Sequence, residues 1–94
     1  LRCKGDSMIN ARIYDGDIVF IRKQPSVENG EIAAVLIDDM ADVAEATLKR
    51  VYVYENKIIL SAENTNYEPF VYVGEEMNNV RIVGKAVAFL SAVK

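Results

Sequence analysis

The residues that could carry chemistry begin with a serine that follows a glycine and an aspartate, in the segment Gly5-Asp6-Ser7-Met8. Two interpretations are open: Ser7 is a turn residue that caps a short helix starting at Met8, or it is a nucleophile. A serine hydroxyl is a weak nucleophile unless a neighbouring base removes its proton. The sequence contains no histidine. Ser-His-Asp and Cys-His catalysis are therefore excluded, and a lysine is the obvious substitute base.

Lys49 is the one of six lysines whose position favours a role as that base. Residues 46–55 alternate in character, which places Thr47, Lys49, Val51 and Val53 on one face of a predicted strand, and these are types that a core-facing side carries. Burial among apolar groups disfavours the ammonium form and lowers the pKa of a lysine from its usual value of ~10.4. Lys49 is therefore a candidate general base. The alternative is a strand lysine that extends its amine to the edge of the sheet.

Composition narrows the class of protein. The 94 residues predict one domain over 1–94, and the net charge of −3 with no basic stripe argues against direct binding of nucleic acid. No apolar run reaches the about 18–20 residues that a membrane span needs, and the first residues lack the pattern of a signal peptide. Cys3 is the only cysteine, so no internal disulfide can form, and the usual zinc ligand sets cannot be built. We expect a cytoplasmic protein without metal or cofactor.

The elements that must position these residues are mostly strands. No segment shows a long helical period, although residues 7–14 could form one helical turn after the serine. The predicted strands span residues 17–23, 31–38, 46–55, 57–63, 70–73 and 81–93, with loops at 24–30 and 64–69. The sequence thus predicts a mainly β fold with little helix, a compact antiparallel domain built as two packed sheets or a partly open barrel.

Five segments in order carry a resemblance to a known family. They read "GDSM", "IYDGDIVFIRK", "NGEIAAVLID", "ATLKRV" and "ILSAENTNYEPF". In this order they resemble the peptidase domain of LexA, of the UmuD-type mutagenesis proteins and of the self-cleaving phage repressors, a group of LexA- and signal-peptidase-like Ser-Lys peptidases. A single motif such as "DGD" is weak, whereas the ordered set is specific and covers residues 4–90. Signal peptidases themselves are similar, but they need a membrane anchor and a further motif after the lysine.

The resemblance assigns roles to individual residues. It implies that Ser7 is the nucleophile and that Lys49 is the base that deprotonates it and later protonates the leaving amine. It implies that Thr47 orients the lysine amine and that Met8 shapes the site. The backbone N–H groups of Ser7 and Asp6 would form the oxyanion hole.

Two other segments are expected to be structural. The "DGD" at 15–17 is interpreted as a turn, in which Gly16 permits the bend and the aspartates form the turn. The spacing between Ser7 and Lys49 is a few residues longer than the resemblance implies, and the excess lies in the acidic segment 39–46. Its neighbourhood holds four carboxylates that lack calcium-loop spacing, so a solvated loop is favoured over a cation site. These are Asp38, Asp39, Asp42 and Glu45.

The resemblance also implies a function. The domain would cleave its own upstream linker in the SOS response to DNA damage, with a RecA–single-stranded-DNA filament as co-protease, and so relieve transcriptional repression. DNA would be bound only through an N-terminal domain that, like the cleavage site, lies outside residues 1–94. This chain alone is then expected to act only in trans. A homodimer through residues 81–94 is expected. The alternatives are a UmuD-like mutagenesis protein and a repressor dimerisation module without catalysis.

Overall fold

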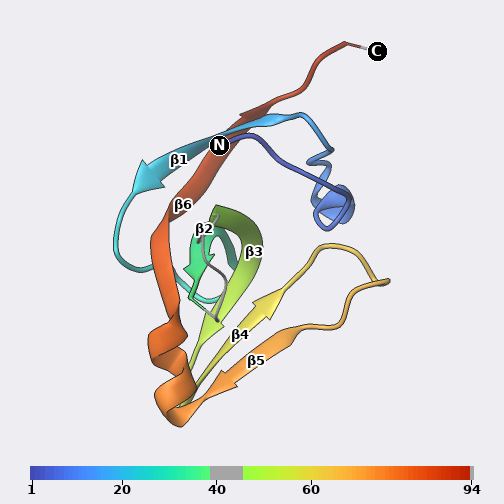
Figure 1. Cartoon of the computed structure of the whole chain (residues 1–94). Helices are drawn as coiled ribbons and strands as arrows, with labels where there is room; N and C mark the ends of the chain where they lie inside the picture. Colours follow the sequence, from blue (N-terminus) through green and yellow to red (C-terminus); the bar gives the residue numbers. More distant parts are fainter. Residues whose placement is uncertain (39–45, 94) are drawn as a thin grey trace.

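The computed structural model describes residues 1–38 and 46–93, and its framework is a single antiparallel sheet (Figure 1). Its six strands lie in the order β1-β6-β2-β3-β4-β5. Their bounds are β1 Ile18–Lys23, β2 Glu31–Ile37, β3 Ala46–Val53, β4 Lys57–Ser61, β5 Phe70–Val73 and β6 Val80–Leu90. The mainly β fold expected from the sequence is confirmed, with one continuous sheet in place of two packed sheets.

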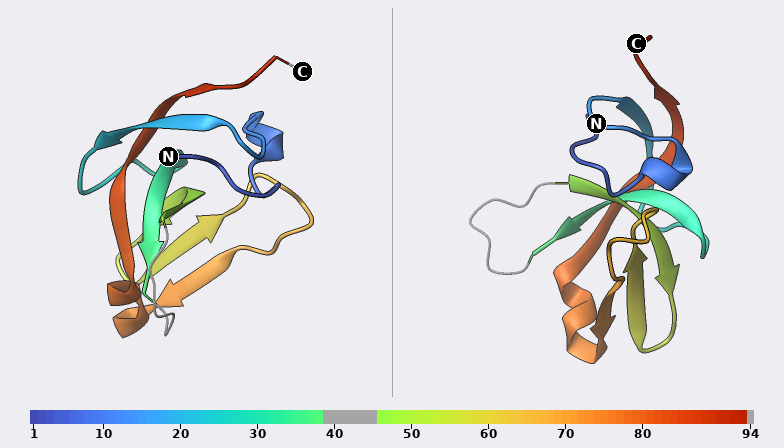
Figure 2. Two further views of the ribbon diagram at one scale, coloured as in Figure 1. Left: turned by 45° about the horizontal axis from the view of Figure 1, so that its top comes forward. Right: turned by 90° about the vertical axis from the view of Figure 1, so that its right-hand side faces the viewer.

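The long strand β6 joins the two halves of the sheet. Its first part, up to Lys85, pairs with β2, and its later part, from Gly84, pairs with β1. Figure 2 shows that the sheet twists strongly, so that β1 and the N-terminal segment lie at one end and β4 and β5 at the other. Gly84 permits the close approach of β1, because a Cβ atom there would lie 2.2 Å from the Arg22 carbonyl oxygen.

Both faces of the central strands are covered by apolar clusters. In the pairing of β2 with β3, Ala34 lies opposite Leu48 and Ala33 lies opposite Lys49. Ala34 and Leu48 join the first cluster, together with Cys3, Met8, Ile13 and Val19. The second cluster, on the other face, contains Ala33, Val35, Val51, Ile58 and Leu60. The core is thus divided by the sheet.

The alternation predicted for β3 describes its faces correctly but not their burial. Leu48, assigned to the face away from the core, is 4% exposed because the first cluster covers it. Val53, expected in the core, is 38% exposed, because it is the last residue of the strand. A period of two distinguishes the faces of a strand, but what packs on each face is decided by distant segments.

Two short 3-10 helices complete the described chain. One, η1 Ile9–Ala11, follows the serine, where the sequence predicted a helical turn; the other, η2 Gly74–Asn79, was not predicted. None of the helices in the described ranges is long and apolar enough to cross a membrane. Three of the four carboxylates of the predicted acidic loop, Asp39, Asp42 and Glu45, fall outside the described residues.

Candidate active site

The N-terminal segment 1–8 is fastened along β1 by backbone hydrogen bonds. The Val19 N–H donates to the Leu1 carbonyl at 2.7 Å, and the Cys3 N–H donates to the Asp17 carbonyl at 2.8 Å. The Gly16 N–H returns a bond to the Cys3 carbonyl, also at 2.8 Å. These bonds direct the Cys3 side chain into the first cluster, where it is 5% exposed. The segment is therefore held in place before it reaches Ser7.

The "DGD" turn is structural, as expected. Gly16 has a φ of +91°, a region that glycine adopts without strain. The Asp15 carboxylate accepts the Gly5 N–H at 2.8 Å, and the Asp17 carboxylate accepts the Tyr14 N–H at 2.8 Å. Asp17, which is 3% exposed, also accepts the Ser91 hydroxyl at 2.7 Å. The two aspartates thus connect the turn to the N-terminal segment and to the end of the chain.

Ser7 stands at the corner where this segment turns into η1. Gly5 has a φ of +81°, which allows the chain to bend ahead of the serine. Met8, which is 0% exposed, anchors the corner in the first cluster. The N-cap position of η1 is Met8, and no side chain caps this helix. The capping interpretation of Ser7 is therefore wrong, and its hydroxyl is left without that structural task.

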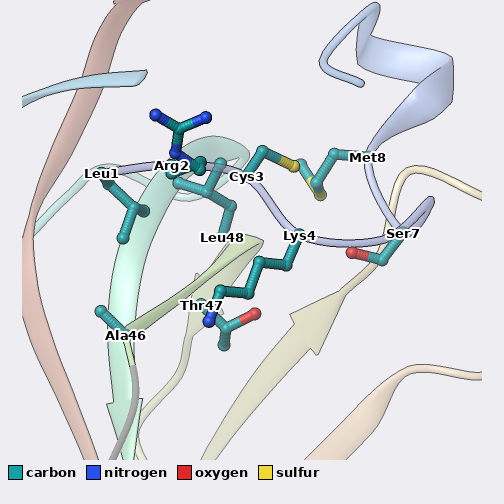
Figure 3. Close-up of a pocket in the computed structure, with 9 residues that line it drawn as sticks. All are labelled: Leu1, Arg2, Cys3, Lys4, Ser7, Met8, Ala46, Thr47 and Leu48. Atoms are coloured by element: carbon teal, nitrogen blue, oxygen red, sulfur yellow. The ribbon is translucent and has the colours of Figure 1, made fainter. Parts of the chain in front are cut away.

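An open pocket of about 370 Å³ lies beside the serine. Ser7, Met8 and Thr47 all line it, so the fold brings together three of the residues singled out in the sequence. Figure 3 shows the Ser7 hydroxyl pointing into the pocket, with Thr47 across from it and the Lys4 side chain extending between them. Cys3 and Leu48 form part of the wall. Lys4 was not assigned to the site from the sequence.

Lys49 lies two residues beyond Thr47 on β3 and is 8% exposed. Burial lowers the pKa of its amine, and the neighbouring Cys3 opposes this by a smaller amount. Among the residues that the structure describes, no carboxylate forms an ion pair with Lys49, and no hydrogen bond joins its amine to Ser7. Lys49 does not itself line the pocket. Catalytic hydrogen bonds often close only when a substrate is bound.

Cys3 and Lys49 lie within electrostatic reach of each other. Burial, followed by Asp17 and Asp15, raises the pKa of the Cys3 thiol. The thiol therefore stays protonated at neutral pH and offers no fixed negative charge to hold the Lys49 ammonium. Burial thus acts on both groups in favour of their neutral forms.

A loop after β4, residues 62–67, holds the serine corner from outside. The Asn10 N–H donates to the Glu63 carbonyl at 2.8 Å, and Asn64 Nδ2 donates to the Asp6 carbonyl at 2.8 Å. The Tyr67 hydroxyl donates to the Asp6 carboxylate, and this hydrogen bond raises the pKa of Tyr67. No role was predicted for Asn64 or Tyr67, because no local pattern shows that residues so far apart along the chain make contact.

The two backbone N–H groups expected to form the oxyanion hole donate no hydrogen bond within the described chain. In residues 1–38 and 46–93, nothing accepts a hydrogen bond from the backbone N–H of Ser7 or of Asp6. Within the same ranges, no three carboxylate or cysteine side chains gather as a metal site. The reactive groups that line the pocket include the hydroxyls of Ser7 and Thr47 and the amine of Lys4, and Lys49 is buried two residues beyond Thr47 on β3.

Comparison with known proteins gives a consistent set of relatives. A family model described as Peptidase S24-like matches residues 1–87. The LexA repressor of Magnetococcus marinus is 43% identical over 94% of this chain and 35% of its own length. Those of Geobacter metallireducens and Desulforamulus reducens are each 46% identical, over 93% and 96% of this chain and 40% and 37% of their own lengths. The chain thus spans less than half of the length of these relatives.

Proposed function

Because this chain belongs to the Peptidase S24-like family, we propose that it is the self-cleaving Ser-Lys peptidase domain of a LexA-like repressor. Its membership confirms the family resemblance of the five sequence segments. In the proposed reaction Ser7 is the nucleophile and Lys49 the general base. The observation that carries this proposal is the buried Lys49, without a carboxylate partner among the described residues and with a lowered pKa, on the strand whose Thr47 shares a pocket with Ser7.

The reaction begins with transfer of a proton. The neutral Lys49 amine takes the hydroxyl proton of Ser7, and Oγ attacks the carbonyl carbon of the peptide bond. The oxyanion of the tetrahedral intermediate accepts hydrogen bonds from the N–H groups of Ser7 and Asp6. The Lys49 ammonium then protonates the amine that leaves, and an ester on Ser7 remains. Water, deprotonated by Lys49, attacks the ester and releases the carboxylate product together with the serine.

The neighbours of Lys49 support a neutral amine. Ala33, its partner in β2, and Val51, two residues on, are both 0% exposed. An ammonium among such groups loses hydration that no charge restores. A substrate that covers the pocket would exclude more water and strengthen this effect, which couples docking to activation of the base. In this proposal the Thr47 hydroxyl, two residues before Lys49 on β3, orients the amine, and the buried Met8 anchors the corner that carries Ser7.

The proposed substrate is a segment of the same polypeptide upstream of residue 1. The relatives named LexA repressor extend well beyond the matched region. An intramolecular substrate has a high effective concentration, so a modest catalytic pair suffices. Cleavage would separate this domain from an N-terminal DNA-binding domain and end repression. A RecA–single-stranded-DNA filament would favour the docked state as part of the SOS response in the cytoplasm.

Dimerisation is part of the same proposal. At the β1–β6 end of the sheet, Phe20, Val87, Phe89 and Leu90 are exposed, with Leu90 at 63%. Ile18 pairs with Leu90 and Phe20 with Ala88, so the apolar surface that carries Phe20 and Leu90 continues across two strands on one face of the sheet. A second copy of the domain would cover it, because contiguous exposed apolar patches are uncommon on monomers.

The proposal is tested with the full-length parent protein and its Ser7→Ala variant. Incubation of the wild type at alkaline pH should give two fragments that meet upstream of residue 1, whereas the variant should stay intact. A small fluorophosphonate probe should label the wild type at Ser7 and leave the variant unlabelled. If a folded wild-type protein shows neither cleavage nor labelling, the peptidase function is contradicted, and a dimerisation module without catalysis remains.

A further inference from the structure

The buried side chain of Asn64 is fixed at both ends of its amide. Asn64 is 5% exposed. Its Nδ2 donates to the Asp6 carbonyl at 2.8 Å, and its Oδ1 accepts the Asn66 N–H at 2.9 Å. Because the two bonds use opposite ends of one planar group, they define which way the amide faces. Asn64 therefore presents a donor to the backbone immediately before Ser7.

This contact also fixes the direction of the Ser7 N–H. The peptide between Asp6 and Ser7 is planar, and the described chain has no cis peptide bonds. In a trans peptide the carbonyl and the N–H point in opposite directions. Since the Asp6 carbonyl points at Asn64, the Ser7 N–H points away from the loop at 62–67. In the described chain no group accepts a hydrogen bond from this N–H.

Building on the proposed function, we propose that Asn64 is a positioning residue for the oxyanion site. By holding the Asp6 carbonyl, it keeps the Asp6–Ser7 peptide in the orientation in which the Ser7 N–H can donate to the developing oxyanion. Preorganised donors are effective because they need not reorient during the reaction. The side chain thus acts on the reaction from the far side of the peptide, without touching the substrate.

Tyr67 provides an internal contrast. Its hydroxyl bonds the Asp6 carboxylate, whereas Asn64 bonds the Asp6 backbone. Tyr67 is 48% exposed, so its contact is made in solvent. Removing it releases a side chain but not the peptide. If orientation of the peptide is what matters, Tyr67→Phe should have little effect where Asn64 variants have a large one.

The test measures the self-cleavage rate of the full-length parent as a function of pH. Asn64→Asp keeps the size of the side chain and the acceptor for Asn66 but loses the donor, and Asn64→Ala loses both without adding charge. Each variant should slow cleavage about 10- to 100-fold. This effect is smaller than the reduction of about 10²–10³-fold that follows deletion of an oxyanion donor itself. The midpoint of the pH profile should not move in Asn64→Ala, which leaves Lys49 untouched and adds no charge. Asn66→Asp, which adds the same charge in the same loop, and Tyr67→Phe should stay within about twofold.

The outcomes separate this inference from the proposed function. Asn64 variants that fold and cleave like Asn66→Asp would overturn the inference and leave the peptidase intact. A shifted pH midpoint in Asn64→Ala would mean that Asn64 acts on the base, and it would also overturn the inference. If both Asn64 variants fail to fold, NMR of the wild type tests the contact instead. A scalar coupling across the hydrogen bond from Asn64 Nδ2–H to the Asp6 carbonyl supports the inference, and its absence contradicts it. A wild type that does not cleave contradicts the proposed function itself.

Discussion

Two lysines flank the same buried alanine and have opposite surroundings. Ala33 of β2 pairs with Lys49 of β3 on one side and with Lys85 of β6 on the other. Residues directly opposite in an antiparallel sheet share a face, so the two lysines belong to one row. Lys85 forms an ion pair with Glu31, and about a third of its side chain is exposed. Lys49 is buried, and the described chain offers it no carboxylate.

The difference shows how one sheet can hold a lysine that is paired with a carboxylate and a buried lysine that has no carboxylate partner in the described chain. Lys85 is paired with Glu31, and this contact lowers the pKa of the Glu31 carboxylate. At Lys49 burial disfavours the ammonium, and the buried Cys3 thiol opposes this by a smaller amount. Both lysines lie in the same row, and they differ in the Glu31 carboxylate beside Lys85 and in the burial of Lys49. Lys85 is therefore the matched control for each prediction about Lys49.

The largest expected effect is on cleavage. In the full-length parent, Lys49→Ala should reduce self-cleavage by about 10³-fold or more, because it removes the base and the proton donor together. Lys85→Ala should leave the rate within about twofold, since the ion pair that it removes is partly exposed and Lys85 does not line the pocket beside Ser7. Both rates are measured from the disappearance of intact protein on a gel. An equal reduction of the cleavage rate in the two variants would contradict the proposed difference between Lys49 and Lys85.

The second expected effect is on the pH profile. Because burial lowers the pKa of Lys49, its neutral fraction and the cleavage rate should rise with pH by about tenfold per unit, and level off below the ordinary lysine value of ~10.4. Rates measured between about pH 6 and pH 10 test this. The Lys85→Ala variant should give the same curve. A flat profile for the wild type would count against a titrating base.

The smallest expected effect is on stability. Lys49→Met replaces a buried amine by an apolar group of similar size and should raise the free energy of unfolding on the order of 1 kcal/mol at neutral pH. The folded pKa is depressed, so the unfolded state binds more protons between that pKa and the ordinary value, and the wild type gains stability as pH rises through this window. The advantage of Lys49→Met should therefore shrink in alkaline solution.

Urea denaturation of the two proteins at neutral and alkaline pH measures this difference. Lys85→Met serves as the control and should show no gain at neutral pH, because Lys85 already has a partner. A stabilisation by Lys49→Met that is the same at both pH values would mean that packing, and not charge, separates the two lysines.

Local patterns predicted much of the fold and part of the site. Alternation located the strands and placed Thr47 and Lys49 on one face, and the glycines marked the turns around Ser7. The same patterns could not show that Leu48 would be buried on the opposite face, because the cover there is the distant segment around Cys3 and Met8. They also ended the last strand too late, since β6 stops at Leu90.

Contacts between distant residues account for the rest. The bond from Asn64 to Asp6 joins residues 58 positions apart, and no sequence period reports such a contact. Glu31 of β2 reaches Lys85 because β6 lies beside β2 in the sheet. Residue types therefore indicated the possible chemistry, whereas the order of the strands determined that, in the described chain, Lys85 and not Lys49 pairs with a carboxylate.

The most direct test is an NMR titration of the lysine side chains in the intact protein, with the Nζ and Cε signals assigned by single substitutions. Lys49 should lose its proton at a clearly lower pH than lysines usually do. It should also do so in the Ser7→Ala variant. A Lys49 amine that titrates at or above the ordinary lysine value would contradict the claim that burial keeps it available as a base.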